Sequence, residues 1–374
     1  IVTSNMPTSS VTDNETVTEE GTLGDHAAET TKLWVFELTP TMSSYLTAIC
    51  AGPYAEWHTE YANEDGRTVP MAMYCRQALA KAFSKDVDYL FDITKKGFAF
   101  YAKTWGVPYP YAKFDQIYVP EYNAGAMENI GMVTIRDQYV FESKVTDAYA
   151  ERRVVTVLHE LAHMWFGDYV TMQWFDDVWT KEVFANFFAA MIVREQFPQI
   201  DHRLNFIRSN VPGAYGEDRT AGSTAIRQQL PNLSDAGLLY SQIIYSKSPV
   251  VMEMLFTKLG PEKFRDGIRE YLADHRYGNA TWDDLIAVLD SRCDEDLAAW
   301  SRIWVDEKGM PTIDMTRHEN RLRIMQSDPF GRRLAWNQPL QLLAFGDGNA
   351  TDTLQCLLDG PETELVLPAG TCCV

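Results

Sequence analysis

The apolar positions of the chain follow two different spacings, which divide it into strand-like and helix-like regions. From residue 76 to about 105, apolar side chains recur every three or four positions, as one face of an amphipathic helix requires. The same spacing returns at 148 and continues to about 308, with loops near 210–235 and 259–261. Short runs bounded by turn residues predict strands at 33–38, 45–51, 69–74, 130–139, 321–325, 340–345 and 365–367.

The order of these elements predicts an α+β fold, with a mainly helical body and a small β unit on each side. We expect three parts, at residues 1–75, 76–309 and 310–374. The turn at 309–311, Gly-Met-Pro, separates the last two parts. A chain of 374 residues is long enough for two or three domains and at least one large core.

Charge and cysteine content narrow the range of partners. The formal net charge of -19 repels phosphate backbones and anionic lipid heads, so nucleic acid and membrane surfaces are poor partners. Six unevenly spaced cysteines in so long a chain do not predict a disulfide framework. No apolar run approaches the length of a membrane span. We expect a cytoplasmic location and leave the oligomeric state open.

The stretch 154–163, Val-Val-Thr-Val-Leu-His-Glu-Leu-Ala-His, holds two histidines at helical spacing. His159 and His163 are four residues apart, so on a helix both imidazoles leave the same face and can bind one cation. His-Glu-x-x-His is a known metalloprotease signature. The alternative is an accidental pair with Glu160 as a surface carboxylate, which arises in a chain of this length about once in a hundred cases.

A third metal ligand is predicted nineteen residues beyond His163. Glu182 begins a second helical stretch, and two helices joined by such a connection can lie antiparallel, which brings Glu182 to the metal. Two imidazoles and one carboxylate leave the fourth position of a tetrahedral Zn²⁺ for water, as in catalytic sites. Glu160 directly follows His159, so its carboxylate can take a proton from the zinc-bound water and deliver it to the leaving amine. We therefore expect one Zn²⁺ per chain.

These motifs, together with the pentapeptide Gly125-Ala-Met-Glu-Asn129 upstream, resemble the M1 zinc aminopeptidases, the aminopeptidase N and leukotriene A4 hydrolase group. The resemblance runs from about residue 45 to the C-terminus. It implies a thermolysin-like (gluzincin) catalytic domain at 76–309 and a small β-sandwich at 310–374. It also implies that residues 1–75 are the last strands of the family's N-terminal β domain, and that the chain is truncated within that domain.

The same resemblance implies a zinc-dependent aminopeptidase that acts on peptides with a free N-terminus. In such an enzyme Glu128 would pair with the substrate's α-ammonium and so set the scissile bond one residue in. The other residues of the pentapeptide, Gly125, Ala126, Met127 and Asn129, would bind the substrate.

Two tyrosines complete the site that the resemblance implies. Tyr245, sixty-three residues after Glu182, matches the family's catalytic tyrosine, which donates its phenolic hydrogen to the oxyanion. Tyr240 matches a second tyrosine near that cleft, a substrate-binding residue. Without the resemblance, a core tyrosine at the start of the apolar helix 250–259 is the competing interpretation of Tyr245.

The chain departs from the common family pattern at two places. Lys181 precedes Glu182 where members usually have asparagine, and Ser-Lys-Ser follows Tyr245 where Glu-Lys-Gly is usual. Neither departure touches a ligand, so we expect them to affect pocket shape and side-chain preference and leave zinc binding intact.

Several interpretations stay open at this point. A zinc endopeptidase of related fold would share the two histidines, an epoxide hydrolase side activity would use the same metal, and a zinc-binding fragment without turnover would need no base. Three acids are candidates either for orienting the imidazoles or for solvated loop positions, namely Asp168, Asp176 and Asp177.

Overall fold

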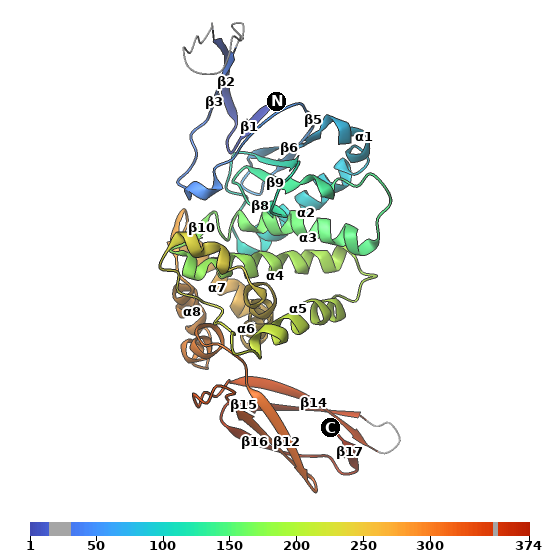
Figure 1. Ribbon diagram of the computed structural model, residues 1–374, viewed down its shortest axis with the longest axis vertical. Helices are drawn as coiled ribbons and strands as arrows, with labels where there is room; N and C mark the ends of the chain where they lie inside the picture. Colours follow the sequence, from blue (N-terminus) through green and yellow to red (C-terminus); the bar gives the residue numbers. More distant parts are fainter. Residues whose placement is uncertain (15–30, 347–350) are drawn as a thin grey trace. The chain divides into compact units, whose positions relative to one another are not determined.

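The computed structural model describes residues 1–14, 31–346 and 351–374 and shows an α+β protein (Figure 1). This confirms the predicted fold class. The described residues divide into two compact units. The first unit comprises Ile1–Gln173, Thr180–Ile200 and Ile268–Ala280, and the second unit comprises Trp174–Trp179, Asp201–Gly267 and Thr281–Val374.

A five-stranded mixed sheet forms one layer of the first unit. Its strands lie in the order β5-β6-β7-β9-β8, with β6, β7 and β9 parallel and the two outer pairs antiparallel. The second half of β6 is buried on both faces, as expected for a central strand covered on two sides. The strands are β5 (Tyr54–Ala62), β6 (Thr68–Arg76), β7 (Phe114–Val119), β8 (Ala126–Met127) and β9 (Met132–Arg136).

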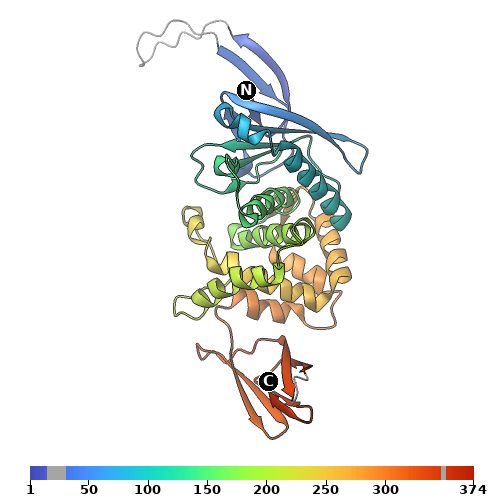
Figure 2. The same cartoon turned by 90° about the vertical axis from the view of Figure 1, so that its right-hand side faces the viewer.

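The first unit also contains three long helices. Both views show α3 between the sheet and α4 (Figures 1 and 2). Helices α2 and α3 approach closely at Gly97, because a Cβ there would lie 2.6 Å from the Leu161 side chain and 2.8 Å from that of Leu158. The helices are α2 (Val87–Trp105), α3 (Asp147–His163) and α4 (Val178–Gln196). Each helix among the described residues is too short or too polar to span a lipid bilayer.

An aromatic cluster holds these helices together. The Trp105 ring stacks on Tyr101 at 4.4 Å between centroids and meets Trp165, Phe166 and Phe188 edge-on at 4.9 to 5.1 Å. Because these rings come from α2, the residues after α3, and α4, the cluster fixes the end of α3 against both neighbours.

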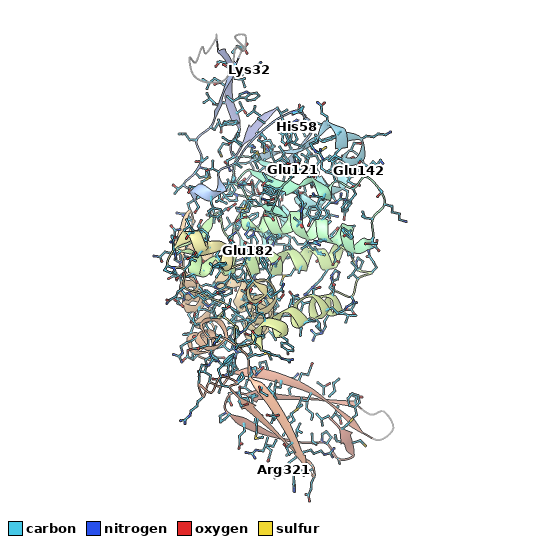
Figure 3. The ribbon with its side chains drawn as sticks, in the orientation of Figure 1. Lys32, His58, Glu121, Glu142, Glu182 and Arg321 are labelled. Carbon is cyan, nitrogen blue, oxygen red and sulfur yellow. The ribbon has the colours of Figure 1, made fainter. Side chains whose placement is uncertain are left out.

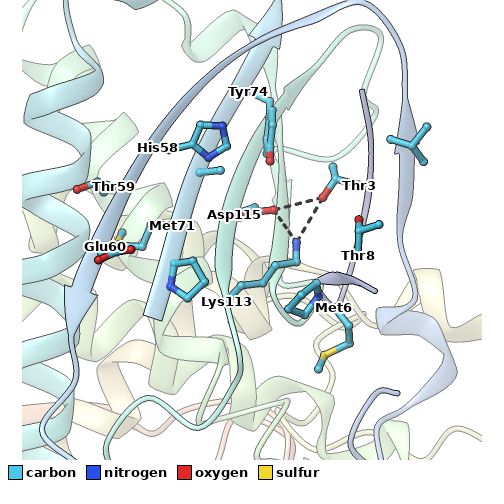
Figure 4. A pocket seen from close by; sticks show the side chains of 14 residues that line it. Thr3, Met6, Thr8, His58, Thr59, Glu60, Met71, Tyr74, Lys113 and Asp115 are labelled. Carbon is cyan, nitrogen blue, oxygen red and sulfur yellow. Dashed lines mark hydrogen bonds and ion pairs between the residues drawn. The ribbon is translucent and has the colours of Figure 1, made fainter. Parts of the chain in front are cut away.

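The N-terminal strands attach to the first unit beside an open cavity of about 540 Å³ (Figure 4). Lys113 and Asp115 form a buried ion pair at its edge, with 2.5 Å between Nζ and Oδ2. The Thr3 hydroxyl donates to the same carboxylate oxygen at 3.2 Å, which ties the first strand to β7. The antiparallel pairs here are β1 (Val2–Ser4) with β4 (Ile49–Ala51) and β2 (Thr8–Asn14) with β3 (Thr31–Phe36).

Smaller elements complete the first unit, namely α1 (Ala80–Phe83) and the parallel pair β10 (Val170–Met172) with β11 (Gly278–Ala280). In the second unit a helical part precedes two three-stranded antiparallel sheets, β12-β13-β16 and β15-β14-β17, which share one apolar core. The helices are α5 (His202–Asp218), α6 (Ser248–Leu259), α8 (Trp282–Asp290), α9 (Leu297–Ser301) and α7 (Pro261–Asp274), whose last residues belong to the first unit. The strands are β12 (Thr312–His318), β13 (Arg321–Ser327), β14 (Gln338–Gly346), β15 (Thr351–Leu358), β16 (Glu362–Val366) and β17 (Thr371–Cys373).

The sequence prediction is wrong at several element boundaries. The strand predicted at 45–51 begins as a 3-10 turn at Ser44–Leu46, and the helix predicted from 76 starts as α1 and breaks before α2. Strands β10 and β11 interrupt the region read as helical, and β1, β2, β5, β8, β12, β15 and β17 were not predicted. Strand β12 is exposed along its whole length, and only two of its seven residues, Ile313 and Met315, are apolar.

Candidate metal centre and active site

Helices α3 and α4 bring the three predicted ligands together. The Nε2 atoms of His159 and His163 are 3.0 Å apart, and Glu182 Oε2 lies 3.5 Å from the first and 4.0 Å from the second. Figure 3 shows Glu182 on α4, within the helical layer. Two ligand atoms at 2.0 to 2.1 Å from a tetrahedral zinc are about 3.3 Å apart. The three donor atoms therefore have a spacing that fits such an ion.

The contacts across the two helices run in opposite order along the chain. Glu182 contacts both imidazoles, and Asn186, four residues further along α4, contacts only the earlier histidine, His159. This is the pattern of antiparallel helices, which the connection between the motifs predicted.

Each histidine uses its other ring nitrogen for a hydrogen bond within the protein. His163 Nδ1 lies 2.9 Å from the Phe166 carbonyl oxygen, and His159 Nδ1 lies 2.9 Å from Asn186 Oδ1. Since a carbonyl oxygen only accepts, both Nδ1 atoms donate, and a neutral ring then keeps its lone pair on Nε2. Two lone pairs facing each other at 3.0 Å repel unless a proton or a metal cation lies between them. The donor set therefore fits a divalent metal.

The pKa values of the two imidazoles differ in direction. Burial lowers the pKa of His163 to about 4, so its ring is neutral near pH 7. Burial also acts to lower the pKa of His159, but the hydrogen bond to Glu182 and the surrounding carboxylates outweigh it and raise that pKa. A divalent cation bound at this point would replace the proton that His159 would otherwise share with Glu182.

The cluster contains two carboxyl groups with opposite tendencies. Burial acts to raise the pKa of Glu182, but the Lys181 ammonium and the two imidazoles outweigh it and hold that pKa well below its usual range. Burial raises the pKa of Glu160 to about 8, although its oxygen lies within 4.8 Å of the imidazole nitrogens. A bound cation would lower the pKa of Glu160 in turn. Glu182 thus suits a ligand, and the position of Glu160 beside the imidazoles suits a group that exchanges a proton there.

The pentapeptide places Glu128 at the end of an edge strand. Ala126 and Met127 form β8, which pairs antiparallel with β9 and is the last strand of the sheet. Glu128 follows directly and is buried. Burial acts to raise its pKa, but the Lys181 charge outweighs it, so the pKa of Glu128 is lowered. A strand edge and an ionised carboxylate therefore adjoin each other.

The rest of the pentapeptide is held by its own hydrogen bonds. The Gly125 carbonyl accepts from the Arg136 backbone at 3.0 Å. The Asn129 side chain accepts from the Thr134 hydroxyl at 2.9 Å and donates to the Leu46 carbonyl at 3.2 Å. Through these hydrogen bonds, Asn129 holds the loop in place beside Glu128.

Tyr240 and Tyr245 lie in the second unit. Tyr245 belongs to a π-helical turn at Ile243–Lys247, and its ring stacks on Tyr240 with 6.2 Å between centroids. Both rings are about two-fifths exposed. The buried pair of Lys247 with Asp218, at 3.0 Å, anchors the end of this turn. The competing interpretation of Tyr245 as a core residue is therefore wrong, because its ring is partly open to solvent.

The three acids proposed as partners of the imidazoles have other surroundings. Asp176 accepts from the Leu230 backbone, and Asp177 pairs with Arg227 at 2.9 Å. Asp168 is buried, and neither of its carboxyl oxygens has a hydrogen-bond partner among the described residues. The partners of the imidazole rings are Asn186 and the Phe166 carbonyl, as described above.

Sequence reasoning missed three residues that shape the site. Asn186 lies four residues after Glu182, and this helical spacing could have identified it as a residue of the same face. The expectation that Lys181 does not touch a ligand is wrong, because its Nζ contacts the proposed ligand Glu182 as well as Glu128. Tyr45, whose hydroxyl donates to Glu128 Oε1 at 3.4 Å, carries no sequence signal because it is distant along the chain.

Comparison with known proteins gives one consistent assignment. The profile described as "Peptidase family M1 domain" matches residues 89–304, more than half of the chain. Aminopeptidase N from Streptomyces lividans is 41% identical over 283 residues, which cover 75% of this chain and 33% of that protein. Tricorn protease-interacting factor F2 from Thermoplasma acidophilum is 32% identical over 300 residues (80% and 37%), and Probable aminopeptidase 2 from Sulfurisphaera tokodaii is 30% identical over 348 residues (91% and 41%).

The chain spans about a third to two-fifths of the length of these curated relatives. The matched region contains every residue of the α3–α4 cluster, from Glu128 through His159, Glu160 and His163 to Glu182. On the strength of the profile match, the chain belongs to peptidase family M1.

Proposed function

We propose that this chain carries the catalytic centre of a zinc-dependent aminopeptidase, with His159, His163 and Glu182 as ligands of one Zn²⁺. The observation that carries the proposal is the close grouping of three possible ligand atoms, with the two Nε2 atoms 3.0 Å apart and Glu182 Oε2 3.5 Å and 4.0 Å from them. Family membership and the relatives named aminopeptidases support the same activity.

Glu160 is the proposed general base. When bound, the metal polarises the scissile carbonyl and lowers the pKa of a water molecule. Glu160 takes a proton from the attacking water and then gives it to the leaving amine, for which a carboxyl pKa near neutrality is favourable. Tyr245 is proposed, from the resemblance alone, as the donor that stabilises the oxyanion of the tetrahedral intermediate, with Tyr240 in substrate binding.

Glu128 and β8 are proposed to make the enzyme an exopeptidase. The free edge of β8 can pair with an extended substrate backbone at Ala126 and Met127, while Gly125 leaves the approach open. Glu128 then pairs with the α-ammonium and stops the substrate one residue from the metal. An endopeptidase would have no use for a buried carboxylate at the end of this strand.

The finer description of the chain is also part of the proposal. We assign a thermolysin-like, gluzincin catalytic domain to 76–309, the last strands of an N-terminal β domain to 1–75, and a β-sandwich to 310–374. The shared apolar core of the two C-terminal sheets supports the last assignment. A cytoplasmic location is proposed from the six cysteines, all of which are free thiols in the structure.

The test compares a tripeptide, leucyl-glycyl-glycine, with its N-acetylated form and with a longer blocked peptide. The protein should contain about one zinc per chain and release leucine from the free tripeptide only. Cleavage of the blocked peptides would identify an endopeptidase. Stoichiometric zinc without turnover of any of the three would identify a binding fragment, and either result would contradict the proposal.

A further inference from the structure

Lys181 occupies the position at which the proposed function places the substrate's amino group. Its Nζ lies 2.5 Å from Glu128 Oε1 and 2.9 Å from Glu182 Oε1. The three side chains are only 6%, 4% and 9% exposed, so these ion pairs are shielded from water. The carboxylate that should receive an α-ammonium is therefore already paired with an ammonium of the protein.

The surroundings of Lys181 are those of a cation site. The Tyr45 ring lies 5.8 Å from Nζ, and the Tyr45 hydroxyl donates to the same Glu128 oxygen that Lys181 contacts. A lysine ammonium and a peptide's α-ammonium are both compact cations with three N–H donors, so they make the same bonds with Glu128. Both cannot stay on one buried carboxylate, because two like charges at contact distance repel strongly away from water.

We propose that Lys181 is a specificity-determining residue that competes with the substrate's α-ammonium for Glu128. The inference rests on the proposed function, in which Glu128 receives that group. A peptide with a charged amino end must displace the lysine from Glu128, whereas a ligand without an amino group leaves the ion pair intact. Lys181 thus weakens the recognition of a free N-terminus.

In this proposal the displaced lysine moves to Asp168, on whose carboxyl group the Lys181 charge already acts. The aliphatic stem of Lys181 packs against Gly167, with Cδ 3.3 Å and Cβ 3.6 Å from where a Cβ on that glycine would lie. Asp168 is the next residue, and its two carboxyl oxygens are buried without a hydrogen-bond partner among the described residues. A buried unpartnered carboxyl group is costly and calls for an explanation. As an alternative partner of Lys181, Asp168 keeps the ammonium paired while a substrate holds Glu128.

The experiment measures binding separately from turnover. In the Glu160→Gln background, leucyl-glycyl-glycine and 4-methylpentanoyl-glycyl-glycine, the same molecule without its amino group, are titrated by calorimetry. Lys181→Asn should bind the free peptide about tenfold more tightly, and should change the affinity for the des-amino peptide by less than about twofold. Lys181→Arg keeps a cation beside Glu128 and should show no such gain.

The role of Asp168 as the alternative partner of Lys181 is tested by a double-mutant comparison. Asp168→Asn should weaken binding of the free peptide when Lys181 is present, and should have no effect in the Lys181→Asn variant. The inference is overturned if Lys181→Asn weakens or leaves unchanged the binding of the free peptide. It is also overturned if both peptides respond alike, as they would if Lys181 only neutralised Glu182.

This series is separable from the proposed function. Zinc content and peptide hydrolysis by the unmodified chain test the aminopeptidase activity by themselves. If that chain holds zinc and removes N-terminal residues but Lys181→Asn has no selective effect, only the present inference fails. If it holds no zinc and cleaves nothing, the proposed function fails, and the affinity series still shows whether Lys181 competes for Glu128.

Discussion

The first unit buries charged side chains in two places, and the two clusters are balanced differently. Beside the cavity of Figure 4, Lys113 faces Asp115, one cation against one anion, with Thr3 as a further donor. Burial lowers the pKa of Lys113 and raises the pKa of Asp115, so both groups are pushed toward their neutral forms. The charges of this pair balance without a further ion, and the pair holds the first strand on the sheet.

In the cluster around helices α3 and α4, acidic side chains outnumber lysine and arginine side chains. Glu128, Glu160 and Glu182 converge there with one ammonium, that of Lys181. The two imidazoles add no permanent charge when their Nδ1 atoms donate to protein oxygens. A buried excess of carboxylates is unfavourable unless protons, as the raised pKa values of Glu160 and His159 indicate, or a metal cation offset it. The two clusters are similarly buried, so the difference between the structural ion pair and the proposed metal site lies in the balance of their charges.

The largest effect is expected from Glu160→Gln. Removing the proposed base should lower kcat for the free tripeptide by roughly 10²- to 10⁴-fold and leave the zinc content unchanged. The matched control is Asp115→Asn, the same chemical change in the structural pair, which should leave kcat unaffected. Equal rates for Glu160→Gln and the unmodified protein would contradict the role of Glu160 as general base, because this carboxyl group would then matter no more for turnover than Asp115.

Removing the metal should lower the free energy of unfolding through the proposed metal site and not through the Lys113–Asp115 pair. At a free zinc concentration of a thousand times Kd, binding raises the free energy of unfolding by about 4 kcal/mol, which thermal unfolding with and without a chelator can measure. Lys113→Met should keep this gain and Glu182→Gln should lose most of it. A gain that depends on Lys113 and not on Glu182 would reverse the assignment of the two clusters.

Removing one partner of the Lys113–Asp115 ion pair should lower the free energy of unfolding more than removing both partners. Lys113→Met leaves the Asp115 carboxyl group buried without its cation and should cost about 3 kcal/mol in urea unfolding. The double variant Lys113→Met/Asp115→Leu should recover most of that loss, since buried ion pairs replaced by apolar groups are often neutral. If the double variant is as unstable as the single one, the pair is more than a self-contained anchor.

A smaller effect is expected from the residue that orients His159. Asn186→Ala removes the acceptor of the Nδ1 hydrogen bond and should weaken zinc binding about tenfold, measured by competition with a chelator. Asn186→Asp keeps an acceptor and should stay close to the unmodified affinity. An unchanged affinity in Asn186→Ala would mean that packing alone fixes the His159 ring.

The grouping of the three proposed metal ligands could be predicted from the sequence because helical geometry is local. His159 and His163 are one turn apart, and a connection of moderate length brought Glu182 to them on an antiparallel helix. Glu160 followed from its place beside a ligand. The fold class and most helices were also within reach, because long amphipathic segments carry a strong periodic signal.

The rest of the site depends on contacts that no local pattern contains. Tyr45 reaches Glu128 from a 3-10 turn that the sequence suggested was a strand. The sequence marked Lys181 as unusual, but only the fold shows that its ammonium lies on Glu128. Asp168 looked like a possible partner of the imidazoles, and the backbone carbonyl that actually accepts from His163 has no side-chain signature.

The central claim is that His159, His163 and Glu182 together hold one divalent cation. Elemental analysis and a competitive zinc titration of the unmodified protein and of Glu182→Gln test it most directly. We predict about one zinc per chain in the unmodified protein and a large loss of zinc in Glu182→Gln. An unmodified protein that binds no zinc, or a Glu182→Gln variant that keeps the same stoichiometry and affinity, would contradict the account.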